Sequence, residues 1–351
     1  MNYEYKVGSE TVRLEPDFDF VAIRFQEPAP MSMRASIARE VGDFTQRLEV
    51  PDEKYTVIPV AQLRESRPAR FHSAVSGLIG REEVARTAAV FKQGSNHVLA
   101  TDRVLVGLDK PSQELLTAAQ EKGWTIDSSG KYRNVVRLNP EEDPFEAAAT
   151  ISALAGIRYA EPDFVTIGPY LPRTRAVTAP TGPSVDPLVS GQYALRVTRA
   201  LEALGLQKGA SSIKIAVLDE GVDSAHEDLR EAVVGHFDAT DNDSFQEPKP
   251  RDAHGTCCAG LAAATGGNGR GIVGAGSGCS ILAVRIAFSD DRDPRRWRVS
   301  NEDIASGIDW AWENGADILS NSWGGGPQSN AINEAFMRAR TEGRVKVDPF
   351  V

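Results

Sequence analysis

The sequence predicts two folded regions in series: a ferredoxin-like α+β region, and then a parallel α/β sheet with helices on both of its faces. The first prediction rests on residues 98–166, where strand and helix patterns follow one another in the order β-α-β-β-α-β. The second rests on short apolar runs that alternate with helical patterns after residue 186, since such alternation is typical of parallel sheets. With 351 residues, 41% of them hydrophobic, the chain is long enough to bury the cores of two or three domains.

Residues 1–97 form a further small α/β region to which the sequence assigns no chemistry. Its patterns are, in order, strand-like residues 12–25 split by a turn signal, helical residues 33–48, and strand-like residues 55–60 and 84–91. The region is either a structural domain or a degenerate copy of the region that follows it. The second alternative rests on the likeness of F-V-A-I-R-F (residues 20–25) to R-V-L-V-G-L (residues 103–108).

The elements of residues 98–166 are marked more clearly. Strands are expected at residues 103–108, 124–127, 134–138 and 157–160, and helices at residues 112–122 and 143–154. Asp143 is the expected N-cap of the second helix, with Pro144 at its first position and Glu146 three residues after the cap. Residues 167–185 are rich in Pro, Gly and Thr, so we expect a linker there.

The parallel sheet belongs to the last region, residues 186–351. We expect its strands at residues 213–218, 233–237, 280–286 and 317–319. Ser300 and Asp303 have the spacing of a capping box at the start of a helix over residues 301–314. The fourth strand carries Ile318 and Leu319, and we expect an apolar sheet edge there.

Composition excludes some classes of function. The formal charge of −10 and the lack of a basic block argue against nucleic acid as a partner. No apolar run approaches the roughly 18 residues of a transmembrane helix, so we expect no membrane association. The N-terminal residues lack the basic start and apolar core of a secretory signal, and three cysteines cannot form a disulfide framework. We therefore expect a cytoplasmic protein.

Two residues of the last region point to acid–base chemistry. Asp219 follows the apolar run 213–218 and precedes a turn at Glu220-Gly221, so it lies at the carboxyl end of a strand, where the ligands of α/β sheets collect. His254 opens D-A-H-G-T-C-C-A-G, whose small residues suit a closely packed helix that starts at the histidine. An Asp in this place can orient a histidine and stabilise its protonated ring. Such a pair supplies the base of a nucleophilic mechanism and the carboxylate that orients it, and the nucleophile itself has still to be identified.

Four motifs occur in the order and spacing of a known family: V-L-D-E-G-V-D, H-E-D-L, H-G-T-C-C-A-G and L-S-N-S-W-G-G-G. With these motifs, residues 186–338 resemble the subtilisin-like serine proteases (subtilases), and a looser likeness reaches back to about residue 98. The resemblance implies an endopeptidase that acts on polypeptides, with Asp219 and His254 as catalytic residues. It implies that Ser322, Trp323 and Gly324 line the substrate cleft, and that residues 98–166 are a propeptide that assists folding and blocks the cleft.

The resemblance also implies that no cofactor is required and that calcium is possible, with Asp228 and Asn268 as candidate ligands. Arg270, in the same loop as Asn268, argues against a cation there. Cys258 follows His254 by one helical turn, so its thiol is expected near the imidazole. A packed, reduced thiol and a thiol sensitive to heavy metals or oxidants are the two interpretations.

The chain departs from the family at its nucleophile. It contains neither the G-T-S-x-A-x-P stretch of the serine nor the A-A-G-N stretch of the oxyanion asparagine, and Ser322 matches the cleft wall instead. The chain therefore has no assigned nucleophile, and residues 186–351 are interpreted as the first half of a catalytic domain. We expect a truncated, frame-shifted or split protease, inactive as it stands, whose partner is a separate C-terminal segment. The alternative is a non-catalytic propeptide-like inhibitor of a cognate protease, a folding aid or a binding module.

Overall fold

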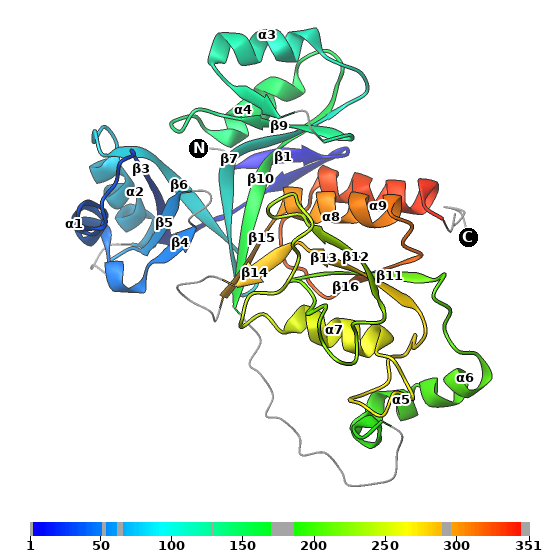
Figure 1. Cartoon of the computed structure of the whole chain (residues 1–351). Helices are drawn as coiled ribbons and strands as arrows, with labels where there is room; N and C mark the ends of the chain where they lie inside the picture. The colour runs from blue at the N-terminus through cyan, green and yellow to red at the C-terminus, as the bar shows by residue number, and fades with distance from the viewer. Residues whose placement is uncertain are drawn as a thin grey trace. The chain divides into compact units, whose positions relative to one another are not determined.

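The computed structural model describes residues 3–50, 54–61, 66–127, 130–169, 186–289 and 296–344, which are drawn in colour in Figure 1. The chain divides into two compact units. Unit 1 comprises Met1–Pro169 with Gly325–Ala331, and unit 2 comprises Tyr170–Gly324 with Ile332–Val351. The expected linker over residues 167–185 lies outside the described residues from residue 170 onward, and its first residues continue a strand of unit 1.

Unit 1 opens with a hairpin and a first β-α-β-β-α-β repeat. The hairpin is β1 (Glu4–Val7) with β2 (Glu10–Arg13), and the repeat is β3 (Pro16–Phe25), α1 (Met31–Val41), β4 (Leu48–Val50), β5 (Tyr55–Pro59), α2 (Arg67–Leu78) and β6 (Val84–Gln93), with a 3₁₀ turn η1 (Phe44–Gln46) after α1. The strands of the repeat lie in the order β4-β5-β3-β6, and each pair is antiparallel. This order, with two helices between the strands, is the ferredoxin-like arrangement.

A second repeat with the same topology follows directly. Its elements are β7 (Asn96–Leu108), α3 (Gln113–Lys122), β8 (Thr125–Asp127), β9 (Arg133–Arg137), α4 (Pro144–Ser152) and β10 (Ile157–Pro169). They pair in the order β8-β9-β7-β10. The expected ferredoxin-like order is confirmed, and so is the N-cap: the Asp143 carboxylate accepts the backbone N–H groups of Phe145 and Glu146. The two runs whose likeness suggested a repeat are the first strands of the two copies.

The two repeats share one sheet within unit 1. Strands β6 and β7 form a tight antiparallel hairpin, in which Gln93 faces Asn96, and Gly94 takes the positive φ that such turns need. The predicted boundary between residues 97 and 98 therefore falls inside β7, which is longer than the predicted strand 103–108. Local sequence patterns do not indicate this hairpin, because it depends on pairing between the last strand of one repeat and the first strand of the next.

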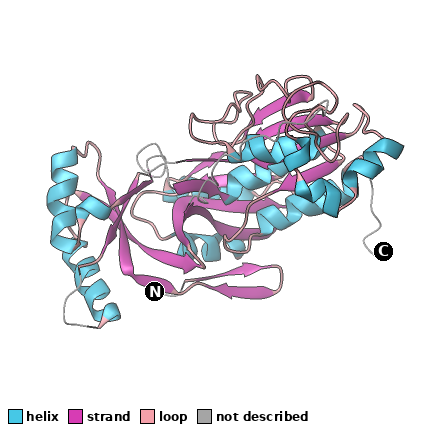
Figure 2. Cartoon of the chain, turned by 90° about the horizontal axis from the view of Figure 1, so that it is seen from below, coloured by secondary structure: helices cyan, strands magenta, loops and turns pink. Residues whose placement is uncertain are grey.

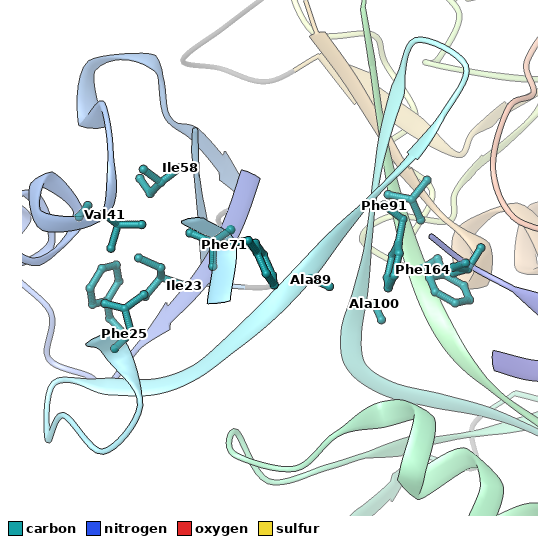
Figure 3. Packing of buried hydrophobic residues seen from close by; sticks show 14 of the residues in the cluster. Ile23, Phe25, Val41, Ile58, Phe71, Ala89, Phe91, Ala100 and Phe164 are labelled. Atoms are coloured by element: carbon teal, nitrogen blue, oxygen red, sulfur yellow. The ribbon is translucent and has the colours of Figure 1, made fainter. Parts of the chain in front are cut away.

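The core of the first repeat explains why its helices lie on one face of its strands, as Figure 2 shows. Ile23 and Phe25 of β3 point to the same side and are buried against Val41 of α1 and Phe71 of α2 (Figure 3). Helix α1 ends at Val41, well before the predicted end at residue 48. The reason is tertiary: Gly42 is extended and forms a β-bridge with Val60, and the Ala61 N–H donates to the carbonyl oxygen of Val41 at 2.9 Å. Helix α2 and the β1–β2 hairpin were not predicted.

Unit 2 is built on a four-stranded parallel sheet at the four predicted places. The strands are β11 (Lys214–Asp219), β12 (Val233–Asp238), β13 (Ser280–Arg285) and β16 (Ile318–Asn321), in the order β12-β13-β11-β16. In this sheet β16 has one described neighbour, β11, and Ile318 is 51% exposed. Around the sheet lie η2 (Val189–Gly191), α5 (Tyr193–Val197), α6 (Ala200–Leu206), α7 (His254–Ala263), the hairpin β14 (Ala287–Ser289) and β15 (Arg296–Ser300), α8 (Asn301–Glu313) and α9 (Asn330–Glu342). The β14–β15 hairpin was not predicted.

Helices cover both faces of this sheet, with α7 on one face and α8 on the other (Figure 1). Ile215 and Val217 of β11 pack in one buried cluster with Ala259 and Ala263 of α7. The next residue, Leu218, points to the opposite face, where Gly307 of α8 leaves room for it. The predicted capping box of α8 is present. In the described part of the chain, no helix combines the length and the apolar character that crossing a membrane requires.

Candidate active site

The end of β11 and the start of α7 bring Asp219 and His254 together. Both carboxylate oxygens of Asp219 lie at hydrogen-bond distance from Nδ1 of His254, at 2.9 Å and 3.0 Å. Asp219 is buried, whereas 37% of the His254 side chain is exposed. Nδ1–H therefore donates to a buried anion, and Nε2 is left as the nitrogen that can exchange a proton with a substrate or nucleophile.

Close packing between the two elements holds the pair in place. A Cβ on Gly255 would lie 2.2 Å from the carbonyl oxygen of Gly221, so only glycine permits this approach of α7 to the end of β11. The backbone N–H of Glu220 donates to Oδ1 of Asp219 at 2.9 Å, which fixes the orientation of the carboxylate. The small residues after His254 have the role that the sequence predicted for them.

The electrostatics of the pair favour the protonated imidazole. The hydrogen bond to Asp219 is the main cause that raises the pKa of His254 above its ordinary value of 6.5, and Cys258 acts in the same direction. Partial burial of the ring opposes both effects. Sγ of Cys258 lies 3.8 Å from Nδ1 and 3.9 Å from Nε2, so the thiol is next to the imidazole as predicted. Cys258 is partly buried, and Cys257 is exposed.

The predicted cleft segment leaves the same edge of the sheet. Strands β11 and β16 are parallel, and Leu218 faces Asn321, so Asp219 and Ser322 are the next residues along the two strands. Ser322 and Gly324 are exposed and Trp323 is half-buried, so this segment is accessible from solvent. No hydrogen bond joins Ser322 to His254 in the described residues of unit 2.

The candidate calcium ligands gather around the loop over residues 265–272. Asp228 is 2% exposed, and its carboxylate accepts a hydrogen bond from the Asn268 amide at 2.8 Å and from the Ile272 N–H at 2.9 Å. The sequence did not single out Asp186, which is 6% exposed and accepts the N–H groups of Gly267 and Gly269 at 2.7 Å and 3.0 Å. The buried carboxylates of Asp186 and Asp228 therefore both accept backbone N–H groups of this loop.

This donor set fits a hard cation such as calcium, which prefers carboxylate, amide and carbonyl oxygens. The loop is shaped around the Asp228 carboxylate, since a Cβ on Gly271 would lie 2.3 Å from Asp228 Oδ2. The Asn268 amide donates to Asp228, and its oxygen accepts the Arg270 N–H at 2.8 Å, so this side chain presently links the carboxylate to the loop. Arg270 still argues against a cation here, because its guanidinium donates to the carbonyl oxygen of Glu227, the residue before Asp228, at 3.3 Å and keeps its positive charge beside the loop.

Comparisons with known proteins agree with this geometry. The subtilase family, Peptidase_S8, matches residues 210–347. Thermitase from Thermoactinomyces vulgaris is 39% identical over 163 residues, which are 46% of this chain and 55% of thermitase. Fervidolysin from Fervidobacterium pennivorans is 30% identical over 213 residues, 56% of this chain and 30% of fervidolysin. The "Calcium-dependent protease" of Trichormus variabilis is 37% identical over 122 residues, 34% of this chain and 16% of that protease.

A solved structure extends the likeness to the fold. The crystal structure of fervidolysin, described as a keratinolytic enzyme related to subtilisin, has a TM-score of 0.52 and 25% sequence identity. The match covers 68% of this chain and 38% of that one. The chain thus spans about half or less of the length of these relatives. With this family match and these relatives, residues 210–347 carry a subtilase (Peptidase S8) domain that is similar to thermitase, fervidolysin and the subtilisins.

Proposed function

We propose that this chain provides the acid–base half of a subtilisin-like serine endopeptidase that cleaves polypeptides by acyl transfer. The observation that carries the proposal is the contact of both Asp219 oxygens with Nδ1 of a half-exposed His254. His254 is the general base that takes the proton of a nucleophilic hydroxyl and later gives it to the leaving amine. Asp219 holds the imidazole in the required tautomer and stabilises its protonated form.

The nucleophile has to come from residues outside these 351, on the same or on a separate polypeptide. Ser322 is no substitute, since it belongs to the exposed segment that follows β16. An oxyanion donor is needed from the same source, because stabilisation of the oxyanion is usually a large part of the rate enhancement. The 351 residues by themselves are therefore proposed to be inactive.

Substrate binding is assigned to Ser322, Trp323 and Gly324. An extended peptide that pairs with this exposed backbone would add a strand beyond β16, which has one described neighbour in its sheet. Its scissile bond would then lie at the sheet edge where Asp219 and His254 meet. The backbone bonds would give affinity without sequence preference, since they do not depend on the substrate's side chains.

Calcium is proposed as a structural ion. Asp186, Asp228 and Asn268 would hold it, and the bound ion would stabilise the loop over residues 265–272. That loop directly follows α7, so the ion would also support the helix that carries His254. No step of the reaction passes through it.

The test of the endopeptidase is casein cleavage by the protein expressed from its natural gene, together with the DNA that follows codon 351. We expect cleavage that a serine-reactive phosphonate blocks and that His254→Ala abolishes. Glu231→Ala, which changes an exposed residue, is the matched control and should retain full activity. Cleavage that survives both the phosphonate and His254→Ala would exclude the proposed mechanism.

A second candidate function rests on unit 1. Its two ferredoxin-like repeats form a continuous sheet with its own buried cores, and this unit does not depend on a nucleophile. It would serve as the inhibitor or folding aid of a subtilase. Adding the full chain to thermitase distinguishes the candidates: saturable inhibition that is unchanged in His254→Ala supports this second function, and the absence of inhibition at any concentration argues against it.

A further inference from the structure

The residue next to Asp219 has a side chain that reaches His254 by a second route. Oε1 of Glu220 accepts the backbone N–H of His254 at 2.6 Å. Glu220 is 5% exposed, so this bond is made in a site largely removed from water. The contact joins the end of β11 to the first residue of α7, which are separated by 34 positions in the chain.

Helix α7 needs such a partner because it has no local cap. The first N–H groups of any helix lack acceptors within the helix, and a side chain at the N-cap usually supplies one. The N-cap of α7 is Ala253, which has no side-chain acceptor and makes no capping bond. A carboxylate at this end also interacts favourably with the helix dipole. Glu220, which directly follows β11, thus supplies the hydrogen-bond acceptor that an N-cap side chain supplies in other helices.

Glu220 binds both members of the pair. Its backbone N–H holds Oδ1 of Asp219, and its carboxylate holds the backbone of His254. The bond between Asp219 and Nδ1 of His254 closes a ring of contacts through these three residues. A further contact lies beside the ring, where the Asp223 N–H donates to Oγ1 of Thr256 at 3.0 Å.

We propose that Glu220 is a positioning residue of the Asp219–His254 pair: it anchors the N-terminus of α7 at His254 and so keeps Nδ1 directed at Asp219. The inference deepens the proposed function, since the pair it positions is the proposed acid–base half of the protease. A helix end without this anchor frays, and the imidazole at its first residue then samples orientations that miss the carboxylate. Glu220 touches neither substrate nor nucleophile, so its role is indirect.

The test uses the full chain labelled with ¹⁵N-histidine and compares three variants by NMR. Glu220→Ala removes the acceptor, Glu220→Gln keeps an amide oxygen in its place, and Glu231→Ala is the control at an exposed glutamate. The measured quantities are the Nδ1–H resonance of His254, the pKa of its imidazole and the unfolding midpoint in urea. None of them requires proteolysis, so a failure of the proposed function leaves this test intact.

In Glu220→Ala we expect loss of the Nδ1–H resonance and a fall of about 1 pH unit in the pKa of His254, because the ring spends less time on Asp219. Glu220→Gln and Glu231→Ala should keep the resonance. The inference is overturned if folded Glu220→Ala keeps both the resonance and the pKa of the unchanged protein, or if Glu220→Gln loses the resonance as alanine does. Should Glu220→Ala fail to fold, the glutamine variant decides.

Discussion

Replacing Asp219 with Asn keeps the shape of the side chain and removes the negative charge beside His254. In the present arrangement the two carboxylate oxygens lie 2.9 Å and 3.0 Å from Nδ1, and this contact is the main cause of the raised pKa of His254. An opposite charge at such a distance shifts a pKa by about 1–3 units. Because 37% of the His254 side chain is exposed, water screens the pair, and we expect the lower part of that range, a fall of about 1–2 units.

The same substitution changes how stability depends on pH. A histidine whose pKa is raised by folding stabilises the folded state in full at pH values below its ordinary pKa of 6.5, where both states are protonated. The contribution is then lost as the pH rises through the raised folded-state pKa. Because the pKa of His254 is raised to about 11, the unchanged protein should lose more unfolding free energy between about pH 6 and about pH 11 than Asp219→Asn does.

Two measurements check this prediction. NMR titration of the histidine resonances reports the pKa of His254 directly, and the resonances of the other four histidines should be unchanged by the substitution. Urea unfolding at the two pH values gives the difference in stability. A pKa of His254 that is the same in Asp219→Asn as in the unchanged protein would refute the assignment of Asp219 as its charge partner.

Three other substitutions follow from contacts within single units. Gly255→Ala places a Cβ 2.2 Å from a backbone oxygen and should lower the unfolding free energy in urea by about 1–3 kcal/mol. Gly260→Ala is the control: its Cβ would lie 3.4 Å from its nearest neighbour, so the loss should be less than about 1 kcal/mol. In unit 1, Asp102→Ala removes a buried carboxylate that pairs with Arg24 at 2.6 Å and with Arg137 at 3.2 Å, and should cost about 3–5 kcal/mol; an unchanged midpoint would contradict this. If calcium binds as proposed, calcium at about 100 times its Kd should add about 2.7 kcal/mol to the unchanged protein but not to Asp228→Asn, as thermal melts with and without chelator would show.

The sequence by itself was enough to place most elements of unit 2 and both members of the pair. The strand that ends at Asp219, the helix that begins at His254 and the capping box at Ser300 all lie within a few residues of their predicted positions. These signals are local: apolar periodicity, a cap or a turn acts on residues that are neighbours in the chain, so a single sequence shows them.

Only the tertiary structure decided which distant residues meet. The single sheet that joins the two repeats of unit 1 depends on the pairing of β6 with β7, and the early end of α1 depends on the β-bridge of Gly42 with Val60. The bond from Glu220 to the N–H of His254 and the approach of Asp186 to the loop of Asp228 are likewise contacts between residues far apart in the chain. No local pattern encodes such partners, because each depends on how whole strands and helices pack against one another.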